Sequence, residues 1–411
     1  MLKYFRKVVS ASLSPDTEGD DIWLAVKILF APWHWTGGSA VGRAEDWFEK
    51  YFSGFHAISF NSGRSALYAL LLAFNIGKND EVFVQSFTCV AVPNSVLWVG
   101  AKPVYIDIDA SLNIDITDAS EKLTKKTRAI IVQHTFGLPA NMDAILAFAG
   151  KHKLVVIEDC AHSLGATSRG KKVGLSGDAA FFSFGRDKVI SSVFGGMAIV
   201  SNAQSDAWLK LKNFHKHLTY PSRFWTFQQI IHPVIFSVVL PFYNIGLGKV
   251  ILVIFQRLKL LSFPVYSVEK QGQRPQDFPA KYPNGLALMF LKQITKLTKF
   301  NSIRKNNAAR YVRSLADKKG IELLSYPKES IYLRFPVLAA DPERLRLHAK
   351  KEGILLGNWY HNVIDPVGVD FKSVGYILGS CPRAESVAKH ILNLPTLLST
   401  REVDLILKNL A

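Results

Sequence analysis

Cysteine is scarce in this sequence, with three residues in 411: Cys89, Cys160 and Cys381. They lie far apart and form no Cys-x-x-Cys pair, so we expect neither a disulfide framework nor a zinc site or other metal ion. Such usage is typical of proteins in a reducing compartment. Residues 1–21 also lack the long apolar segment of a cleaved secretory signal. We therefore predict a cytoplasmic protein.

Acidic residues are also few. The chain has 33 Asp and Glu against 50 Lys and Arg, which gives a formal net charge of +17. This excess favours an anionic partner, namely nucleic acid, a phosphorylated substrate or acidic lipid headgroups. No helix-turn-helix, zinc-finger or RNA-binding signature is present, and the aromatic residues lie mostly within apolar segments. Nucleic acid is therefore the least expected of the three partners.

Apolar residues make up 48% of the chain, which is enough for a substantial core. From about residue 58 to 200, short β-branched segments alternate with helical patterns. This alternation predicts a mostly parallel α/β sheet that is covered by helices. The expected helices are 65–74 and 141–152, the second with Asn141 or Asp143 at its start. The expected strands are 82–85, 103–107, 129–133, 154–158, 179–184 and 197–200.

Two polar residues close apolar segments in this region. Lys188 follows the apolar segment 179–184, and Asp159 ends the segment 154–159. A lysine and an acid at the ends of two buried strands suggest pyridoxal phosphate (PLP) chemistry, in which the amine forms a Schiff base and the carboxylate keeps the pyridine nitrogen protonated. Each residue also has a simpler interpretation: Lys188 as a solvated surface charge, and Asp159 as the N-cap of a following helix.

The segment 61-NSGRSALYALL-71 places a small polar turn directly before a helix. Backbone N–H groups and the helix dipole can bind a phosphate at such a turn. Taken alone, an ordinary N-cap with a tight turn explains the segment better. However, a phosphate turn, an acid-ended strand and a lysine follow one another along the chain, as a PLP site at strand ends requires.

Six landmarks resemble, in order and spacing, those of the DegT/StrS-type sugar aminotransferases, a branch of the fold-type I PLP enzymes. The resemblance is densest from about Gly54 to Asn202 and extends more loosely over the chain. It implies an α/β, fold-type I aminotransferase-like architecture, with a mostly parallel sheet in a large domain and a smaller C-terminal α/β domain. The landmarks are 62-SGRSAL-67, 79-NDEVFVQSFT-88, 100-GAKPVYIDID-109, 127-TRAIIVQHTFGLPANMDAI-145, 155-VVIEDCAHSLGA-166 and 177-GDAAFFSFGRDK-188, followed by 195-GGMAIVS-201.

The resemblance implies roles for individual residues. Lys188 matches the Schiff-base lysine, which also moves a proton, and Asp159 matches the acid that pairs with the pyridine nitrogen. His162 takes the place of a side chain that lies close to the cofactor, with a purely structural histidine as the alternative. Ser183 aligns with a hydroxyl that helps to bind the cofactor phosphate.

Further cofactor contacts follow from the same resemblance. Ser62, Gly63 and Arg64 match the phosphate turn. Arg64 replaces the usual Thr, and its side chain either adds a charged phosphate contact or points to solvent. Cys89 stands where an aromatic ring commonly stacks on the cofactor, so its thiol either packs against the ring or is a small buried residue. Asn284 resembles an Asn that reaches across a dimer interface to the neighbouring subunit's phosphate.

Residues 203–280 fit the family least, and we predict an apolar insertion over 216–280. Residues 224–248 contain no Lys, Arg, Asp or Glu. Pro233 and Pro241 interrupt this tract, and basic residues flank it, so a straight membrane span is not expected. One hypothesis is a broken hairpin that makes peripheral contact, through residues 224–256, with the inner face of the membrane. The other is a helical insertion that is buried in a dimer or against the core.

We thus divide the chain into three parts: an N-terminal segment with the large PLP-binding domain (1–215), the insertion (216–280), and a connecting helix with the small domain (281–411). Helical spacing predicts that the connecting helix runs over 284–320. The candidate substrate contacts are Trp359, Tyr360 and His361, because the family often places such contacts in this region. Further pieces of the small domain are expected at 331–338, 342–353, 384–395 and 401–410.

The resemblance implies transamination by a homodimer. An amino-acid donor, most often glutamate in the family, converts PLP to its pyridoxamine form, which then aminates a nucleotide-linked keto-sugar for amino-sugar and cell-envelope polysaccharide biosynthesis, such as that of lipopolysaccharide. The positive charge suits a diphosphate substrate. One alternative is a PLP-dependent sugar dehydratase, in which His replaces the lysine, so Lys188 argues against it. The other is a non-catalytic binding or regulatory protein that retains the fold.

Overall fold

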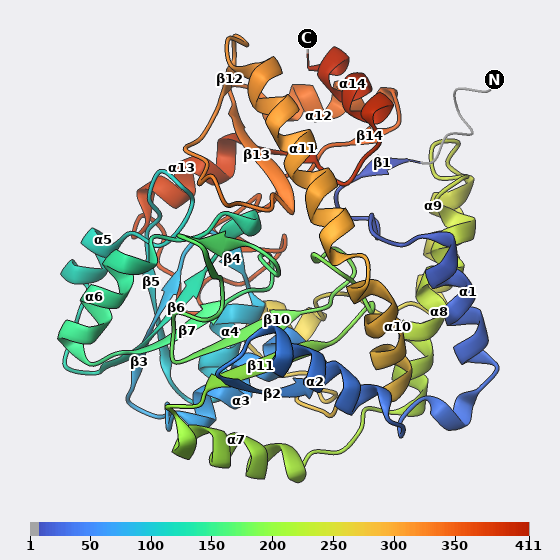
Figure 1. Ribbon diagram of the computed structural model, residues 1–411. Coiled ribbons are helices and arrows are strands. Elements are labelled where there is room, and N and C mark those ends of the chain that lie inside the picture. Colours follow the sequence, from blue (N-terminus) through green and yellow to red (C-terminus); the bar gives the residue numbers. More distant parts are fainter. Residues whose placement is uncertain (1–7, 411) are drawn as a thin grey trace.

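The computed structural model describes residues 8–410, and a seven-stranded sheet with helices on both faces lies at its centre (Figure 1). The strand order is β2–β11–β10–β7–β6–β3–β5, and β11 alone in this sheet runs antiparallel to its neighbours. The predicted strands and the predicted α/β class are confirmed. The strands are β2 (Phe55–Phe60), β3 (Glu81–Gln85), β5 (Lys102–Ile106), β6 (Thr127–Gln133), β7 (Val155–Asp159), β10 (Ala179–Ser183) and β11 (Gly196–Ser201).

Alternate side chains of the strands face two different helix layers, as the two-residue period of a strand requires. Phe181 packs with α3 (Gly63–Ala73), α4 (Ala91–Trp98) and α7 (Ser205–Lys216). Its neighbour Phe182 faces α2 (Ala40–Tyr51) and α10 (Asn284–Ile294) on the opposite side. Farther along that side, Ile130 packs with α5 (Ile116–Glu121) and α6 (Met142–His152). Both faces of the sheet are therefore buried.

The C-terminal part forms a three-stranded antiparallel sheet in the order β12–β13–β16, next to α11, α12 and α14 (Figure 1). The single connecting helix expected over 284–320 is wrong. It is divided at Thr295 and Lys296, because α10 packs in the core of the large sheet, whereas α11 packs on the small sheet. The elements are α11 (Leu297–Leu315), β12 (Ile321–Glu322), β13 (Arg334–Ala339), α12 (Pro342–Lys351), α13 (Pro382–His390), β16 (Ile391–Pro395) and α14 (Thr400–Asn409).

The predicted insertion is a hairpin of two helices, α8 (Arg223–Val239) and α9 (Leu247–Arg257). Pro233 lies inside α8 without ending it, contrary to expectation, and the chain reverses over 240–246. The first half of α8 joins the main core through Trp225 and Ile230, next to α1 (Gly19–Leu29). The rest of the hairpin has an apolar cluster of its own. None of the helices in the described part has the length and apolar content that crossing a membrane requires.

Short two-stranded pairings connect distant parts of the chain. Strands β4 and β15 are parallel and place Cys89 beside Asp365, which brings the segment after residue 356 to the carboxyl ends of the large sheet. The N-terminal strand β1 pairs with β14 of the small sheet region. These strands are β1 (Val9–Ser10), β4 (Thr88–Cys89), β8 (Thr167–Ser168), β9 (Lys171–Lys172), β14 (Ile354–Leu355) and β15 (Ile364–Asp365).

Candidate active site

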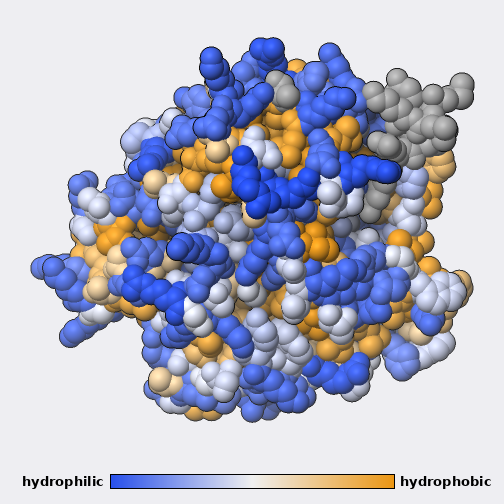
Figure 2. Space-filling model, turned by 45° about the horizontal axis from the view of Figure 1, so that its top comes forward, coloured by the Kyte–Doolittle hydropathy of each residue, from blue (hydrophilic) through white to orange (hydrophobic). Residues whose placement is uncertain are grey.

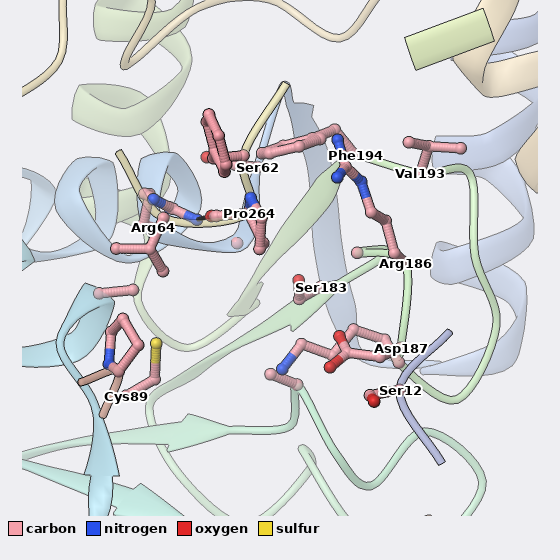
Figure 3. Close-up of a pocket in the computed structure, with 18 of the residues that line it drawn as sticks. Ser12, Ser62, Arg64, Cys89, Ser183, Arg186, Asp187, Val193, Phe194 and Pro264 are labelled. Carbon is pink, nitrogen blue, oxygen red and sulfur yellow. Dashed lines mark hydrogen bonds between the residues drawn. The ribbon is translucent and has the colours of Figure 1, made fainter. Parts of the chain in front are cut away.

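A cavity of about 510 Å³ lies at the carboxyl ends of β7 and β10 and at the start of α3. Ligands of open α/β sheets bind at this edge, where the strand order places crossover connections on both sides. In Figure 3, Ser183 lies near the middle of the view, Arg64 and Cys89 lie on one side, and Arg186 and Asp187 lie on the other. Side chains from three distant parts of the sequence therefore face one space.

Lys188 and His162 contact each other in this cavity. The Lys188 Nζ atom lies 2.9 Å from His162 Nε2 and 5.4 Å from the centre of the Trp359 ring. Burial, together with the positive charges of Lys188 and Arg334, holds the pKa of His162 well below its usual range. The imidazole is therefore neutral at physiological pH, and its Nε2 atom forms a hydrogen bond with the lysine amine.

Asp159 lies at the end of β7 and pairs in the sheet with Phe181 of β10. Burial raises the pKa of its carboxyl to about 6, and the Ala161 N–H, which donates to Oδ1 at 3.0 Å, and the charge of Lys188 oppose this rise. A buried carboxylate of this kind favours a cationic partner, such as a protonated ring nitrogen. Residues 161–165 form turns and no helix, so Asp159 is not a helix N-cap.

The phosphate turn is packed directly against the strand ends. Ser62 caps α3, and its Oγ accepts a hydrogen bond from the Ser65 N–H at 3.2 Å. A Cβ atom on Gly63 would lie 2.9 Å from Ser183 Cβ, and one on Gly196 would lie 2.4 Å from the carbonyl carbon of Ser62. No side chain fits at either glycine, and the helix N-terminus is left open to a ligand in the cavity. This cradle fits a phosphate, with the Ser183 hydroxyl beside it.

Arg64 does neither of the two things considered from the sequence. Its guanidinium pairs with the fully buried carboxylate of Glu269 and donates to the carbonyl oxygen of Pro264 at 2.6 Å (Figure 3). It also lies over the Phe278 ring, 5.1 Å from the ring centre. Arg64 thus anchors the segment that follows the hairpin to the phosphate turn, and it is not a free phosphate ligand.

The structure separates the remaining candidates. Trp359 and Tyr360 line the cavity with their rings 5.7 Å apart and nearly parallel, whereas His361 lies outside it, with Nδ1 2.5 Å from Asp365 Oδ1. Cys89 lines the cavity, and burial raises the pKa of its thiol to about 11, so the thiol is uncharged.

Asn284 does not line the cavity of its own chain. Its side-chain amide is engaged locally: it accepts a hydrogen bond from the Ala40 N–H at 3.0 Å and donates to the His34 carbonyl oxygen at 2.8 Å. A Cβ on Gly38 would lie 2.4 Å from the same amide, so the segment before α2 closes tightly over it. In this chain the residue connects α10 to the segment 34–40.

Arg186 and His232 are among the cavity residues that the sequence analysis missed. Arg186 is half-buried and donates to Ser262 Oγ at 2.5 Å and to Gln229 Oε1 at 3.5 Å, both from the insertion. Burial lowers the pKa of Arg186 to about 10, so the residue stays charged. His232 of α8 lines the same cavity. The available signals were the place of Arg186 between Ser183 and Lys188, and a histidine inside an uncharged apolar tract.

One cluster among residues 8–410 has the spacing of metal ligands: His134, Glu158 and Cys160. Its polar atoms are already used. Ala140 N–H donates to His134 Nδ1 at 3.0 Å, Nε2 lies 3.0 Å from Glu158 Oε2, and three backbone N–H groups donate to the same carboxylate. The cluster is a buried structural network that fixes the start of the β7–β10 connection.

Comparison with known proteins agrees with this geometry. The model of the DegT/DnrJ/EryC1/StrS aminotransferase family matches residues 16–227 and 269–410. The unmatched segment, 228–268, contains most of α8 and all of α9. Solved chains of this fold carry the cofactor as PLP or as its pyridoxamine form.

The individual relatives have different names. GDP-perosamine synthase of Caulobacter vibrioides is 43% identical over 178 residues, which are 42% of this chain and 48% of that protein. The pleiotropic regulatory protein of Geobacillus stearothermophilus is 30% identical over 364 residues, 87% of this chain and 84% of that protein. The structure of GDP-4-keto-6-deoxy-D-mannose-3-dehydratase of Escherichia coli, with bound hydrated PLP, covers 99% of both chains with a TM-score of 0.74 at 19% identity.

The alignments differ in extent. The chain spans about half the length of several of the curated relatives that it matches. The family model, by contrast, covers the large sheet, the cavity residues at its edge and the small sheet. The chain therefore belongs to the DegT/DnrJ/EryC1/StrS aminotransferase family of fold-type I PLP enzymes.

Proposed function

We propose that this protein is a PLP-dependent aminotransferase. It transfers an amino group from an amino acid, with glutamate as the first candidate donor, to a keto-sugar that is attached to a carrier through a phosphate. The observation that carries the proposal is one cavity with a lysine amine, a buried carboxylate and a phosphate cradle. The names of relatives such as GDP-perosamine synthase support a nucleotide-linked sugar as the reference substrate, and a homodimer is part of the proposal.

The residues of the chain have separate tasks in this reaction. When bound, PLP supplies a ring that withdraws electrons from the carbon next to the transferred nitrogen. The N-terminus of α3 and Ser183 would hold its phosphate, and the Asp159 carboxylate would keep its ring nitrogen protonated. Lys188 Nζ takes and returns the proton at the reacting carbon, and His162 Nε2, 2.9 Å away, orients this amine.

A second candidate is a regulatory protein that keeps the fold. The name of the Geobacillus relative, which matches over most of both chains, supports this alternative. It differs from the enzyme in an observable way: a regulator has no need of a lysine that binds the cofactor covalently and exchanges an amino group. The dehydratase alternative is less well supported, because Lys188 occupies the position that His takes there and because 19% identity to a dehydratase shows the fold alone.

The test is a spectrum of the purified protein with PLP, followed by addition of glutamate. We expect the absorbance of lysine-bound cofactor, its loss when glutamate donates the amino group, and its return with a nucleotide-linked keto-sugar. Lys188→Ala should lose at least about a thousandfold in turnover with an unchanged circular dichroism spectrum. Near-normal turnover of this variant, or a wild-type protein without the spectral change, would contradict the proposal.

A further inference from the structure

The cavity has a second part that transamination does not use. Beyond the strand ends, its wall is formed by apolar side chains of the hairpin and of the N-terminal segment. The residues are Leu13, Phe236, Leu252, Leu261 and Phe263. The polar groups of an amino-acid donor and of a sugar find few partners here, and a nucleotide base would bury N–H and C=O groups against hydrocarbon. This part, the apolar arm, is suited to a hydrocarbon chain.

The junction between the apolar arm and the strand ends is built for an anion. Arg186 lies there half-buried and has no carboxylate within ion-pair distance among the described residues. Its Nε and both ring nitrogens of His232 are buried and lack a hydrogen-bond partner in the described part of the chain. Burial holds the pKa of His232 well below its usual range, so its ring is neutral and has one N–H donor. Buried polar atoms without partners are rare in folded proteins, so this N–H and the Arg186 Nε–H in a cavity wall indicate a ligand with phosphate-like oxygens.

The apolar arm opens beside the exposed face of the hairpin. Phe263, which lines the cavity, is 51% exposed, so it lies at the entrance. Helix α9 packs against α8 through one side and presents to solvent a stripe of apolar residues at helical spacing. The stripe consists of Leu247, Val250, Val253, Ile254 and Leu258. In Figure 2, hydrophobic surface lies along the edge of the molecule on which α9 lies in Figure 1.

Basic residues border this stripe. Lys249 and Arg257 lie on α9, and Lys259 follows it; all three are exposed. No ion pair joins any of them to a described acidic residue. An amphipathic helix with an exposed apolar stripe and basic borders is the arrangement that lies in the interface of an anionic membrane.

We propose that the carrier of the keto-sugar is a lipid phosphate, which the protein takes from an anionic membrane surface. This inference rests on the proposed function and names its substrate class. The sugar lies at Lys188, the carrier phosphate at Arg186 and His232, the first part of the lipid chain in the apolar arm, and α9 on the bilayer. The hairpin thus serves both as membrane contact and as part of the substrate site.

Binding measurements test the apolar arm without the sugar. The purified PLP-loaded protein is titrated calorimetrically with farnesyl phosphate, with GDP and inorganic phosphate as comparators. Farnesyl phosphate should bind at least about tenfold more tightly than either comparator. Phe263→Gln and Leu252→Gln should each weaken farnesyl phosphate binding at least about fivefold and leave inorganic phosphate binding and the cofactor spectrum unchanged. Ile377→Gln, which changes an apolar side chain that is 74% exposed and outside the cavity, is the matched control.

Vesicle sedimentation tests the surface of α9. Deleting the hairpin is unsuitable, because Trp225 and Ile230 of α8 are in the main core. The double variant Val250→Glu/Ile254→Glu changes two exposed positions instead. Wild-type protein should sediment with vesicles of phosphatidylglycerol and phosphatidylcholine, the double variant should lose at least about tenfold in binding, and Ile377→Glu/Leu378→Glu should behave as wild type.

The outcomes separate the two proposals. Amination of nucleotide-linked keto-sugars, together with GDP binding tighter than farnesyl phosphate, would overturn the lipid carrier and leave the aminotransferase standing. Phe263→Gln without effect on farnesyl phosphate would overturn the apolar arm. A third outcome combines two results: the wild-type protein stays in the supernatant, and Val250→Glu/Ile254→Glu dissociates a dimer in sedimentation velocity. This outcome would show that α9 contacts a second copy of the chain, and it would also overturn the lipid-carrier proposal. An absent spectral response to glutamate would reject the aminotransferase itself, whatever binds the arm.

Discussion

Replacing Arg64 by Met should strongly destabilise the protein. The Arg64 side chain is 10% exposed and that of Glu269 is 0% exposed, so the substitution leaves a carboxylate buried without its cation. Removing one partner of such a pair costs about 3–5 kcal/mol. Met keeps much of the apolar stem that lies over Phe278, so the loss reports mainly on charge. The Pro264 carbonyl also loses its donor, which adds about 1 kcal/mol.

A second substitution separates the ion pair from packing. Arg64→Met/Glu269→Gln removes the stranded charge, while the Gln oxygen can still accept the Tyr266 N–H. The double variant should therefore recover most of the loss and remain within about 1–2 kcal/mol of wild type. Free energies of unfolding come from urea titrations of the cofactor-free protein, followed by far-ultraviolet circular dichroism.

The alternative role of Arg64, as a phosphate ligand, makes the opposite prediction. It requires Arg64→Met to weaken PLP binding while the free energy of unfolding changes by less than about 1 kcal/mol, as for an exposed charge. That pair of results would refute the ion pair and the anchoring role that the structure assigns. Both quantities are measured on the same preparations, with PLP affinity obtained from a cofactor titration.

Two further substitutions test buried carboxylates. Asp159→Asn should retain PLP but lose turnover by about two to three orders of magnitude, because a neutral amide cannot stabilise a protonated pyridine nitrogen; unchanged kcat in steady-state assays would place Asp159 outside the site. Asp16 is buried near Arg304, Asp21 and Asp187, and burial raises the pKa of its carboxyl from 3.8 to about 8. Between about pH 4 and pH 8 this carboxyl is ionised in the unfolded chain and protonated in the folded one, so the free energy of unfolding falls as pH rises through this range. Asp16→Asn should therefore increase the melting temperature at pH 8 and have little effect at pH 4, and an equal effect at both would contradict this assignment.

Much of the fold could be predicted from local sequence patterns. The strands around Val84, Ile131 and Phe181 appear as short β-branched or aromatic segments, and two-residue alternation is a property of the strand itself. Helix starts were also readable, since Asn141 caps α6 and Ser62 caps α3 through bonds to residues three positions later. The division between α10 and α11 could not be predicted from the sequence, because both segments have helical spacing. Their packing against two separate cores decides where α10 ends and α11 begins.

The residues that we propose as catalytic were similarly accessible. Asp159 and Ser183 are the last residues of two strands that the sequence predicts, and Lys188 follows the second strand after a short turn. Parallel strands bring their carboxyl ends to one edge. Asn284 and His361 were selected by position along the chain, and the structure keeps both outside the cavity of this chain. The Asn284 amide bonds to Ala40 and His34, and His361 Nδ1 lies against Asp365.

The sequence by itself determined the elements, their order and the chemistry at the strand ends, because these depend on periodicity and on residues next to one another. The tertiary structure decided which distant groups meet. Arg64 reaches Glu269 across 205 positions, and Arg186 meets Ser262 across 76, distances over which no local pattern specifies a partner. His232 looked like part of an apolar tract until folding placed it in the cavity wall. Burial changes the meaning of a polar residue, and burial is set by packing.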